Sequence, residues 1–382
     1  MKRGRDRAGS SLHCPSFSTF PSCPIMHTFD LVVVGAGGGP DETNLSAYLF
    51  KPHDKKWEDG IVALEAGSGQ GALAQLMHNN PAIFSSFQPE DSTIKTKVHS
   101  ASDIYSFVRC YLLTHAHLDH INSLVISAGS LRGPRRRVHS LKQTLENLEL
   151  VFNDRIWPNL ASWKEDDDEV KLLYSLLVPD VQYTTIFPDV SVRAMPINHG
   201  KNPLGEYESA AFFIRHDPSL REFLFFGDVE PDSVAEKPRT INVWRAAASK
   251  IPDTLSTLFI ECSYPSGRPD NILFGHLTPE HLVAELIVLA QEVVAYRRQK
   301  STSDLRKRPI RKRQKRNSIT PDDLKGSLLG LRVCIIHCKD DASSGAASPI
   351  REVILAQVRQ LVEAKKLGAK VFAAEQGACI SI

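Results

Sequence analysis

The sequence predicts an α/β fold, arranged as a four-layer αββα sandwich. Its 382 residues are 42% hydrophobic and 24% charged, which is enough apolar material for one large core with insertions. Short apolar runs rich in β-branched residues follow one another, and helical patterns lie between groups of them. Because strands and helices do not alternate strictly, a layered sandwich fits this order better than a doubly wound sheet.

Short apolar runs mark the expected strands. Residues 29–34 read FDLVVV, a continuous run typical of a strand buried on both faces. Residues 61–64 form a second run, which ends at Glu65, and residues 109–113 form a third, which ends at Thr114. The later strand predictions are residues 191–196, 211–215, 222–226, 257–260 and 332–336.

Helical periodicity lies between these groups, over residues 118–127, 140–151 and 279–299. Thr278 stands at the N-cap position of the last helix. Pro279 follows it at the first helical position, where a missing amide hydrogen costs nothing.

The glycine cluster after the first strand, GAGGGP at residues 35–40, invites comparison with a dinucleotide-binding loop. That loop needs the pattern G-x-G-x-x-G, so that a helix N-terminus can hold the pyrophosphate. Here Pro40 occupies the third glycine position, and the carboxylates of Asp41 and Glu42 would repel phosphate. We therefore reject a dinucleotide site.

Composition excludes several classes of protein. The net charge of +2 gives no global preference for nucleic acid or membrane. The seven cysteines are scattered without a CxxC pair, which indicates reduced thiols rather than a disulfide framework. No apolar run approaches the ~20 residues that span a bilayer, and residues 1–26 lack the apolar core of a secretory signal. These features predict a cytoplasmic protein, with a nuclear location left open.

We expect residues 1–26 to be a disordered tail and residues 27–382 to form one domain. Within that domain, residues 297–327 are polar, and residues 306–316 include eight Lys or Arg. Like-charge blocks of this size predict a disordered basic insertion, with nuclear import or contact with an anionic partner as the sharper alternative. The acidic run at residues 165–169 predicts a solvated loop or helix face.

The segment THAHLDH, residues 114–120, carries the strongest chemical signal. His115 and His117 are two residues apart, so on extended backbone their side chains point the same way. Asp119 and His120 fall at the turn into a helix, where the chain can aim them at a second nearby point. Imidazole nitrogen and carboxylate oxygen suit zinc, manganese or iron. The segment therefore predicts a site for divalent metal ions.

Two ions need more ligands than these four, and isolated candidates stand downstream at strand ends. His199 follows the strand at residues 191–196, Asp228 follows the apolar run ending at Phe226, and His337 follows residues 332–336. A carboxylate such as Asp228 can bridge two ions.

This order of residues resembles the metallo-β-lactamase-like hydrolases, and more closely the class II cyclic-nucleotide phosphodiesterases of the fungal type. The resemblance rests on GGPDETNLSAYLF, HAHLDHINSLVISA, GDVEPD and VCIIHCKD, and it covers the chain from about Phe29 onward except the basic insertion. It implies the metallo-β-lactamase-like form of the αββα sandwich. One departure is Glu65-Ala66-Gly67, where the family has Asp; the acid there is expected to support the histidine loop.

The resemblance also implies the ligand sets. His115, His117 and His199 would hold one metal ion, Asp119, His120 and His337 would hold the other, and Asp228 would bridge them. The ions are expected to be zinc, with manganese or iron(II) as alternatives. His276 resembles a residue that donates a proton to the leaving oxygen, and Glu261 would orient it; whether His276 or His337 is the seventh ligand stays open. Lys339 and Asn198 are expected to contact the substrate, and Asp119 also to act in catalysis.

The function implied by the resemblance is hydrolysis of 3′,5′-cyclic AMP, with cyclic GMP left open, to the nucleoside 5′-monophosphate. A hydroxide activated by two metal ions would attack phosphorus, and cyclic-nucleotide signalling would fall. The expected partner is this small molecule, not a membrane or a nucleic acid, and a homodimer stays open. The alternatives are another hydrolase of this fold, such as a 3′ tRNA-processing endonuclease or a thioester or lactone hydrolase, and a non-catalytic binding module.

Overall fold

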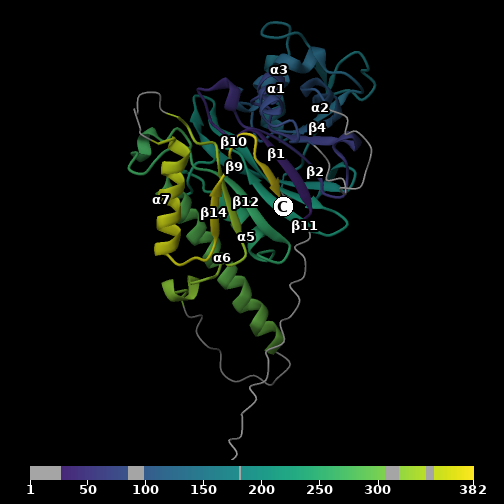
Figure 1. Ribbon diagram of the computed structural model, residues 1–382. Helices are drawn as coiled ribbons and strands as arrows, with labels where there is room; N and C mark the ends of the chain where they lie inside the picture. Colours follow the sequence, from purple (N-terminus) through teal and green to yellow (C-terminus); the bar gives the residue numbers. More distant parts are fainter. Residues whose placement is uncertain (1–26, 85–98, 180–181, 306–317, 341–347) are drawn as a thin grey trace, which may run out of the picture.

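The computed structural model describes residues 27–84, 99–179, 182–305, 318–340 and 348–382 (Figure 1). The expected N-terminal tail, residues 1–26, and the basic block at residues 306–316 lie outside the described residues. Within the described ranges, no helix combines the length and apolar character that crossing a bilayer requires.

Two β-sheets form the middle of the molecule in the described residues (Figure 1). The first sheet has eight strands in the order β15-β1-β2-β3-β4-β5-β7-β6. They span β1 Phe29–Gly35, β2 Ala47–Pro52, β3 Ile61–Leu64, β4 Val108–Leu112, β5 Arg136–Ser140, β6 Ala161–Ser162, β7 Leu172–Leu176 and β15 Cys379–Ser381.

The second sheet has seven strands in the order β14-β13-β12-β11-β10-β9-β8. They span β8 Thr184–Phe187, β9 Val190–Asn202, β10 Gly205–His216, β11 Arg221–Phe226, β12 Leu255–Glu261, β13 Arg332–Ile336 and β14 Lys370–Ala373.

Each sheet changes from antiparallel to parallel pairing partway across. In the first sheet β1, β2 and β3 are antiparallel, whereas β3, β4, β5 and β7 are parallel. In the second sheet β8 to β11 are antiparallel, whereas β11 to β14 are parallel. The carboxyl ends of parallel strands meet at one edge of a sheet, which is where ligands bind in open α/β sheets.

Helices cover the outer face of each sheet (Figure 1). The helices beside the first sheet are α1 Gln70–Asn79, α2 Ala101–Phe107, α3 Leu118–Ser127 and α4 Lys142–Val151. Those beside the second sheet are α5 Thr240–Ala248, α6 Pro279–Leu305 and α7 Ile350–Ala364. Short 3-10 helices span Glu42–Asn44, Trp57–Asp59, Ala128–Ser130, Asp270–Ile272 and Pro321–Leu324.

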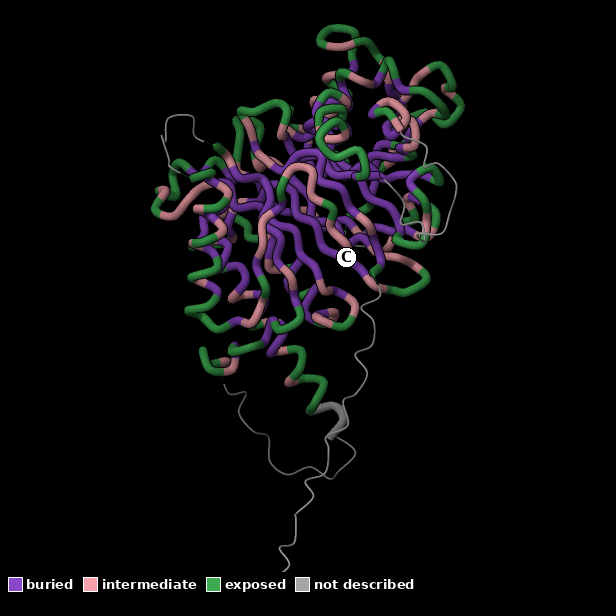
Figure 2. Tube along the Cα trace, viewed as in Figure 1, coloured by how far each residue is buried: buried purple, intermediate pink, exposed green. Residues whose placement is uncertain are grey.

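The hydrophobic core has three parts, one for each interface between neighbouring layers. One lies between the first sheet and its helices, one between the two sheets, and one between the second sheet and its helices. Between the sheets, the rings of Phe29, Phe50 and Phe223 meet edge to face at centroid distances of 5.3–5.6 Å, a favourable arrangement for aromatic pairs. The central strands of both sheets are therefore buried (Figure 2), and the predicted αββα sandwich is confirmed.

The strands and helices predicted from apolar runs are all present, and helix α3 has the predicted bounds of residues 118–127. The prediction missed β2, β5, β6, β7, β8, β14 and β15 and the helices α1, α2, α5 and α7. In β2 the charged Lys51 follows four apolar residues. That ammonium is buried and paired with Asp30 at 2.7 Å, so the strand accommodates a charge that its sequence alone would place in solvent. The acidic run at residues 165–169 is a solvated loop, as expected, and Glu165 pairs with Arg137 at 2.8 Å.

The expected disordered insertion at residues 297–327 is wrong at both ends. Helix α6 continues to Leu305, and Pro321–Leu324 forms a 3-10 helix in which the buried Leu324 packs on the core. Residues 297–301 are mostly exposed, so their polar composition reflects a solvent-facing part of this helix. Residues 306–317 lie outside the described part of the chain.

Candidate metal centre

The predicted histidine segment lies at the carboxyl end of β4 and runs directly into α3. Thr114 and His115 are buried, His117 caps the start of the helix, and Asp119 and His120 lie in its first turn. The rings of His115 and His120 are 4.1 Å apart, and those of His115 and His117 are 4.7 Å apart. One short segment thus places its polar side chains in a single small volume.

The first group of potential metal ligands comprises His115, His117, His199 and Asp228, whose ligand atoms all lie within 4.8 Å of one another. Nε2 of His199 lies 3.1 Å from Nδ1 of His117 and 3.6 Å from Oδ2 of Asp228. Nε2 of His115 is also 3.6 Å from Oδ2 of Asp228. His117 is the exposed member of the group, so this group is open to solvent.

The second group comprises Asp119, His120, Asp228 and His337, again within 4.8 Å. Nε2 of His337 lies 3.1 Å from Oδ2 of Asp119 and 3.1 Å from Nε2 of His120. Nε2 of His120 is 3.3 Å from Oδ1 of Asp228. Asp228 belongs to both groups and therefore stands where a bridging carboxylate would.

The donor atoms in these groups fit divalent cations. Nε2 of His115 and Oδ2 of Asp228 are buried and have no hydrogen-bond partner, which is costly for a polar atom. Two pairs of ring nitrogens also face each other at 3.1 Å, His117 with His199 and His120 with His337. Imidazole nitrogens and carboxylate oxygens are ligands of zinc, manganese and iron, so a cation would satisfy all of these atoms.

Partners outside the two groups fix the orientation of the rings. Nδ1 of His199 donates to the carbonyl of Gly275 at 2.9 Å, which leaves Nε2 free to face inward. Nδ1 of His115 lies 3.1 Å from the hydroxyl of Thr114, and Nδ1 of His337 lies 3.1 Å from the hydroxyl of Ser263. Such partners are typical of metal-binding histidines, because they select the tautomer and hold the ring.

Glu65 supports the histidine segment, as expected from its place after β3. One carboxylate oxygen accepts a hydrogen bond from the backbone amide of Thr114 at 3.1 Å. The other lies 3.5 Å from Nδ1 of His120. Glu65 adopts a left-handed backbone with φ of 60°, which places its longer side chain beneath the segment.

Burial and local charge set the protonation of the histidines. Burial lowers the pKa of His115 well below its usual range and lowers the pKa of His199 to about 3, so both rings are neutral at pH 7. Burial also opposes protonation of His120, but nearby carboxylates, Asp228 foremost, raise its pKa well above the usual range. His115 and His199 are therefore in the neutral form that metal binding needs, whereas His120 would release its proton when a metal ion binds.

Glu261 joins the second group to a further histidine. Its carboxylate accepts a hydrogen bond from Nδ1 of His276 at 2.9 Å and another from the hydroxyl of Ser263 at 2.6 Å. Glu261, His276 and His337 form a third set with metal-ligand spacing. His276 approaches Asp228 only at 3.8 Å, through the nitrogen that Glu261 already holds. This geometry favours His337 over His276 as a ligand.

Close backbone approach also shapes the site. A Cβ on Gly38 would lie 2.4 Å from Cε1 of His337, so only glycine lets the loop after β1 cover that ring. Gly275 has a φ of +79°, and a Cβ there would lie 2.8 Å from Nδ1 of His199.

A pocket of about 360 Å³ adjoins the first group and shares His117 and His199 with it. Its other lining residues are Gly200, Lys201, Asn202, Tyr207, Glu230, Val234, Asp270, Asn271, Leu273, Phe274 and Gly275. The ring of Tyr207 stacks on His117 with centroids 4.5 Å apart and an interplanar angle of 12°. The pocket thus begins at the potential metal ligands and leads outward.

The two residues expected to contact substrate lie near the groups. Asn198 precedes His199 in β9 and is buried, and its Oδ1 has no hydrogen-bond partner. Lys339 follows the His337 loop, is partly exposed, and its backbone amide donates to the carbonyl of Ser263 at 3.0 Å. Neither residue lines the pocket beside His117.

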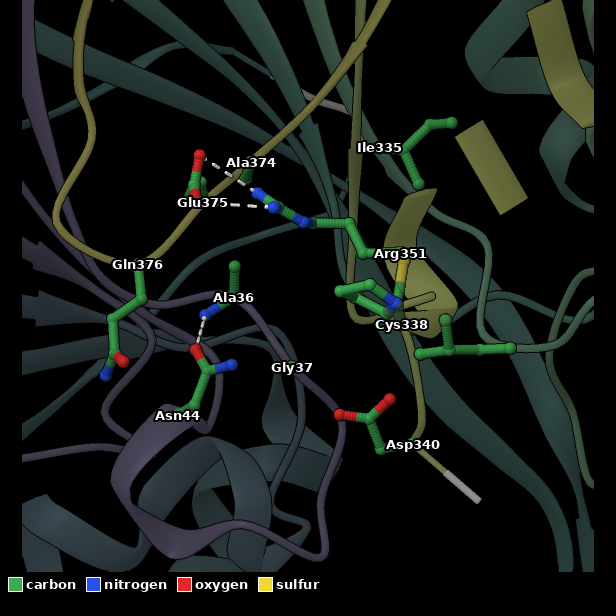
Figure 3. Close-up of a pocket in the computed structure, with 12 residues that line it drawn as sticks. Ala36, Gly37, Asn44, Ile335, Cys338, Asp340, Arg351, Ala374, Glu375 and Gln376 are labelled. Carbon is green, nitrogen blue, oxygen red and sulfur yellow. Dashed lines mark hydrogen bonds and ion pairs between the residues drawn. The ribbon is translucent and has the colours of Figure 1, made fainter. Parts of the chain in front are cut away.

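A second pocket, of about 300 Å³, lies behind the His337 loop (Figure 3). Its lining includes Gly37, Cys338 and Arg351, but no member of the two ligand groups. Arg351 pairs with Glu375 at 3.2 Å across it. This pocket is therefore separate from the candidate metal centre.

Sequence reasoning found all seven members of the two groups but missed Thr114, Ser263, Gly275 and Tyr207 as supporting residues. Ser263, Gly275 and Tyr207 act through contacts with residues far along the chain, which no spacing in the sequence signals, whereas Thr114 acts on the adjacent His115. The unusual glycine run at residues 35–40 was the one available signal for Gly38.

The chain matches known proteins over most of its length. Residues 31–377 match the family described as cAMP phosphodiesterases class-II. The chain is 36% identical to a 3′,5′-cyclic-nucleotide phosphodiesterase of Schizosaccharomyces pombe over 282 residues, which are 71% of this chain and 78% of the relative. It is 30% identical to a protein of the same name from Aliivibrio fischeri over 354 residues, 92% of each chain.

Solved structures agree on the fold. The chain resembles unliganded yeast PDE1 with a TM-score of 0.74 at 23% identity, covering 94% of this chain and 100% of that one. It also resembles the metallo-β-lactamase fold protein YhfI of Bacillus subtilis with a TM-score of 0.51 at 14% identity, covering 93% and 99%. At these identities the likeness concerns the fold alone, and it agrees with the metallo-β-lactamase-like sandwich that the sequence predicts.

Proposed function

Because the chain belongs to the class-II cyclic-AMP phosphodiesterase family, we propose that it hydrolyses 3′,5′-cyclic AMP to 5′-AMP and so lowers cyclic-nucleotide signalling. The observation that carries the proposal is the pair of ligand groups sharing Asp228, of which the first group contributes His117 and His199 to a pocket large enough for a small ligand. Similarity to curated 3′,5′-cyclic-nucleotide phosphodiesterases supports the choice of substrate.

Two divalent ions would be held by the two groups, with Asp228 between them. Zinc is the proposed metal, because the groups are rich in imidazole and contain carboxylates. When bound, the ions would supply a water-derived nucleophile at neutral pH and offset the negative charge of the phosphate.

The protein's own residues would orient the reaction. Asp119 has a partly exposed carboxylate in the second group, so it can accept a hydrogen bond from the attacking water. Water adds across the bond between phosphorus and the 3′ oxygen, so that oxygen must receive a proton. Glu261 holds Nδ1 of His276, which leaves Nε2 of His276 to donate that proton.

Two further residues would contact the substrate. The partly exposed Lys339 follows the His337 loop, so its ammonium can reach a phosphate oxygen at the outer edge of the second group. The unpaired Oδ1 of Asn198 can accept a hydrogen bond from a ribose hydroxyl or from water beside the first group.

The test is an assay of the purified full-length chain against cyclic AMP, cyclic GMP and a precursor tRNA, with and without a chelator. We expect conversion of cyclic AMP to 5′-AMP, loss of that activity in chelator, and recovery on adding zinc. Cleavage of the precursor tRNA without hydrolysis of cyclic AMP would instead support a nuclease on the same fold. Metal analysis of the untreated protein gives the number and identity of the ions.

A further inference from the structure

Besides histidine, two aromatic residues line the pocket beside the first ligand group, Tyr207 and Phe274. Tyr207 already stacks on His117, so its face toward the metal centre is covered. Phe274 also lines the pocket, and 68% of its surface is exposed. Exposure alone is common for single hydrophobic side chains, so the case for a binding role depends on where Phe274 lies and on the loop that holds it.

The backbone at Phe274 is strained in a way that presents the ring to the pocket. Its φ is 53°, in the left-handed region that a residue with a Cβ seldom adopts, and Gly275 follows with a φ of +79°. The carbonyl of Gly275 accepts the hydrogen bond from Nδ1 of His199. The loop that holds a ligand of the first group therefore also sets the position of Phe274, and such strain is typical of ligand clamps.

Neighbouring residues steady the ring. The guanidinium of Arg268 lies 3.6 Å from the centroid of Tyr264 and 5.7 Å from that of Phe274, and Nε of Arg268 donates to the carbonyl of Ile272 at 2.7 Å. Tyr264 in turn meets His276 edge to face at 5.7 Å. A continuous series of contacts thus runs from the proposed proton donor to Phe274.

On the premise that the chain hydrolyses cyclic nucleotides, we infer that Phe274 stacks on the nucleobase while the phosphate lies at the metal centre. The pocket starts at His117 and His199, so a phosphate held there directs its ribose and base outward, toward Phe274. Every base has a π-face, so stacking supplies affinity for all cyclic nucleotides and little discrimination. Polar side chains that line the same pocket, such as Asn202 and Asn271, are placed to contact base edges.

The experiment compares Phe274→Ala, Phe274→Gly and Phe274→Trp with the wild-type chain. The substrates are cyclic AMP, cyclic GMP and methyl riboside 3′,5′-cyclic phosphate, which has no base. Stacking on an aromatic residue is worth ~1–3 kcal/mol per base, so Phe274→Ala should raise KM for both nucleotides by roughly 5- to 150-fold with little change in kcat. KM for the baseless substrate should not change, and Phe274→Trp should retain the wild-type values. Leu329→Ala, which removes an equally exposed side chain outside the pocket, is the matched control.

Phe274→Gly separates binding from folding. Glycine relieves the left-handed strain, so its melting temperature should be no lower than that of the wild type while its KM rises as for Phe274→Ala. An equal rise in KM for the baseless substrate would show that Phe274 only holds the loop, and an unchanged KM for cyclic AMP would overturn the inference directly.

Calorimetric binding of 5′-AMP and of ribose 5-phosphate distinguishes failure of the inference from failure of the proposed function. Loss of 5′-AMP affinity in Phe274→Ala, with ribose 5-phosphate unaffected, supports the stacking role even in a chain that does not hydrolyse cyclic AMP. Active hydrolysis combined with unaltered 5′-AMP affinity in the variant contradicts the stacking role alone.

Discussion

The two sheets supply the candidate metal centre in different ways. The first sheet provides four of the seven ligand candidates from one segment, residues 115–120, at the end of β4. The second sheet provides one candidate from each of three places: His199 in β9, Asp228 after β11 and His337 after β13.

This difference shows that the positions of the ligand candidates are fixed in two ways. In the segment of the first sheet, local backbone geometry sets the spacing, because a strand end and a helix start lie within a few residues. In the second sheet, the positions depend on strand register and on contacts between loops, such as the hydrogen bond from His199 to Gly275. We therefore expect the second sheet's ligands to depend more on supporting contacts than the first sheet's do.

Asp228→Ala should have the largest effect, because Asp228 is the one carboxylate that belongs to both groups. We expect loss of both metal ions and a fall in activity of more than ~100-fold, since outer partners of ligands alone cost about 10–100-fold. Metal analysis and the cyclic-AMP assay measure the two effects. Asp253→Ala, an exposed carboxylate before β12, is the control, and normal metal content in Asp228→Ala would refute a bridging role.

Gly38→Ala should have the next largest effect. The added Cβ would meet the ring of His337 at 2.4 Å, so the ring or the loop must move away from Asp119. We expect roughly 10- to 100-fold weaker metal binding, with the ion of the second group lost first. Gly71→Ala, where a Cβ meets nothing within 4 Å, should behave as the wild type in the same metal titration. Unchanged metal affinity in Gly38→Ala would contradict the role of the Gly38 loop in holding the His337 ring.

Ser263→Ala and Thr114→Val compare supporting hydroxyls in the two sheets. Each hydroxyl lies 3.1 Å from Nδ1 of a ligand histidine. Ser263 links His337 to Glu261 across strands, so its loss should weaken metal binding by about 10-fold. Thr114 is adjacent to His115 in the chain, where the backbone already directs the ring, so its loss should cost less. Equal losses in a metal titration would remove the distinction between the two sheets.

The contrast between a contiguous segment and residues brought together by the fold also explains what the sequence could predict. THAHLDH was recognisable because its ligands are contiguous, and the strands of the core were recognisable because buried runs are continuous. Ser263 and Phe274 were not, because their roles arise from the register of β12 with β13 and from one strained loop. The burial of Lys51 in β2 was likewise not predictable, because its partner Asp30 comes from another strand and only the fold brings the two together.

His139 shows what a buried histidine does outside the site. It lies in β5 of the first sheet, its Nε2 has no hydrogen-bond partner, and burial, with a smaller effect of Arg137, lowers its pKa to about 4. The unfolded chain takes up a proton near pH 6.5. Between pH 6.5 and 4 the unfolded state therefore binds more protons, so stability falls as the pH falls.

His139→Leu should remove this contribution, which is about 1 kcal/mol between pH 7.5 and 5.5, from the pH dependence of urea unfolding. Metal content should stay at the wild-type level, because His139 belongs to none of the ligand groups found in the described residues. An unchanged slope of stability against pH would show that His139 is solvated or already protonated in the folded protein.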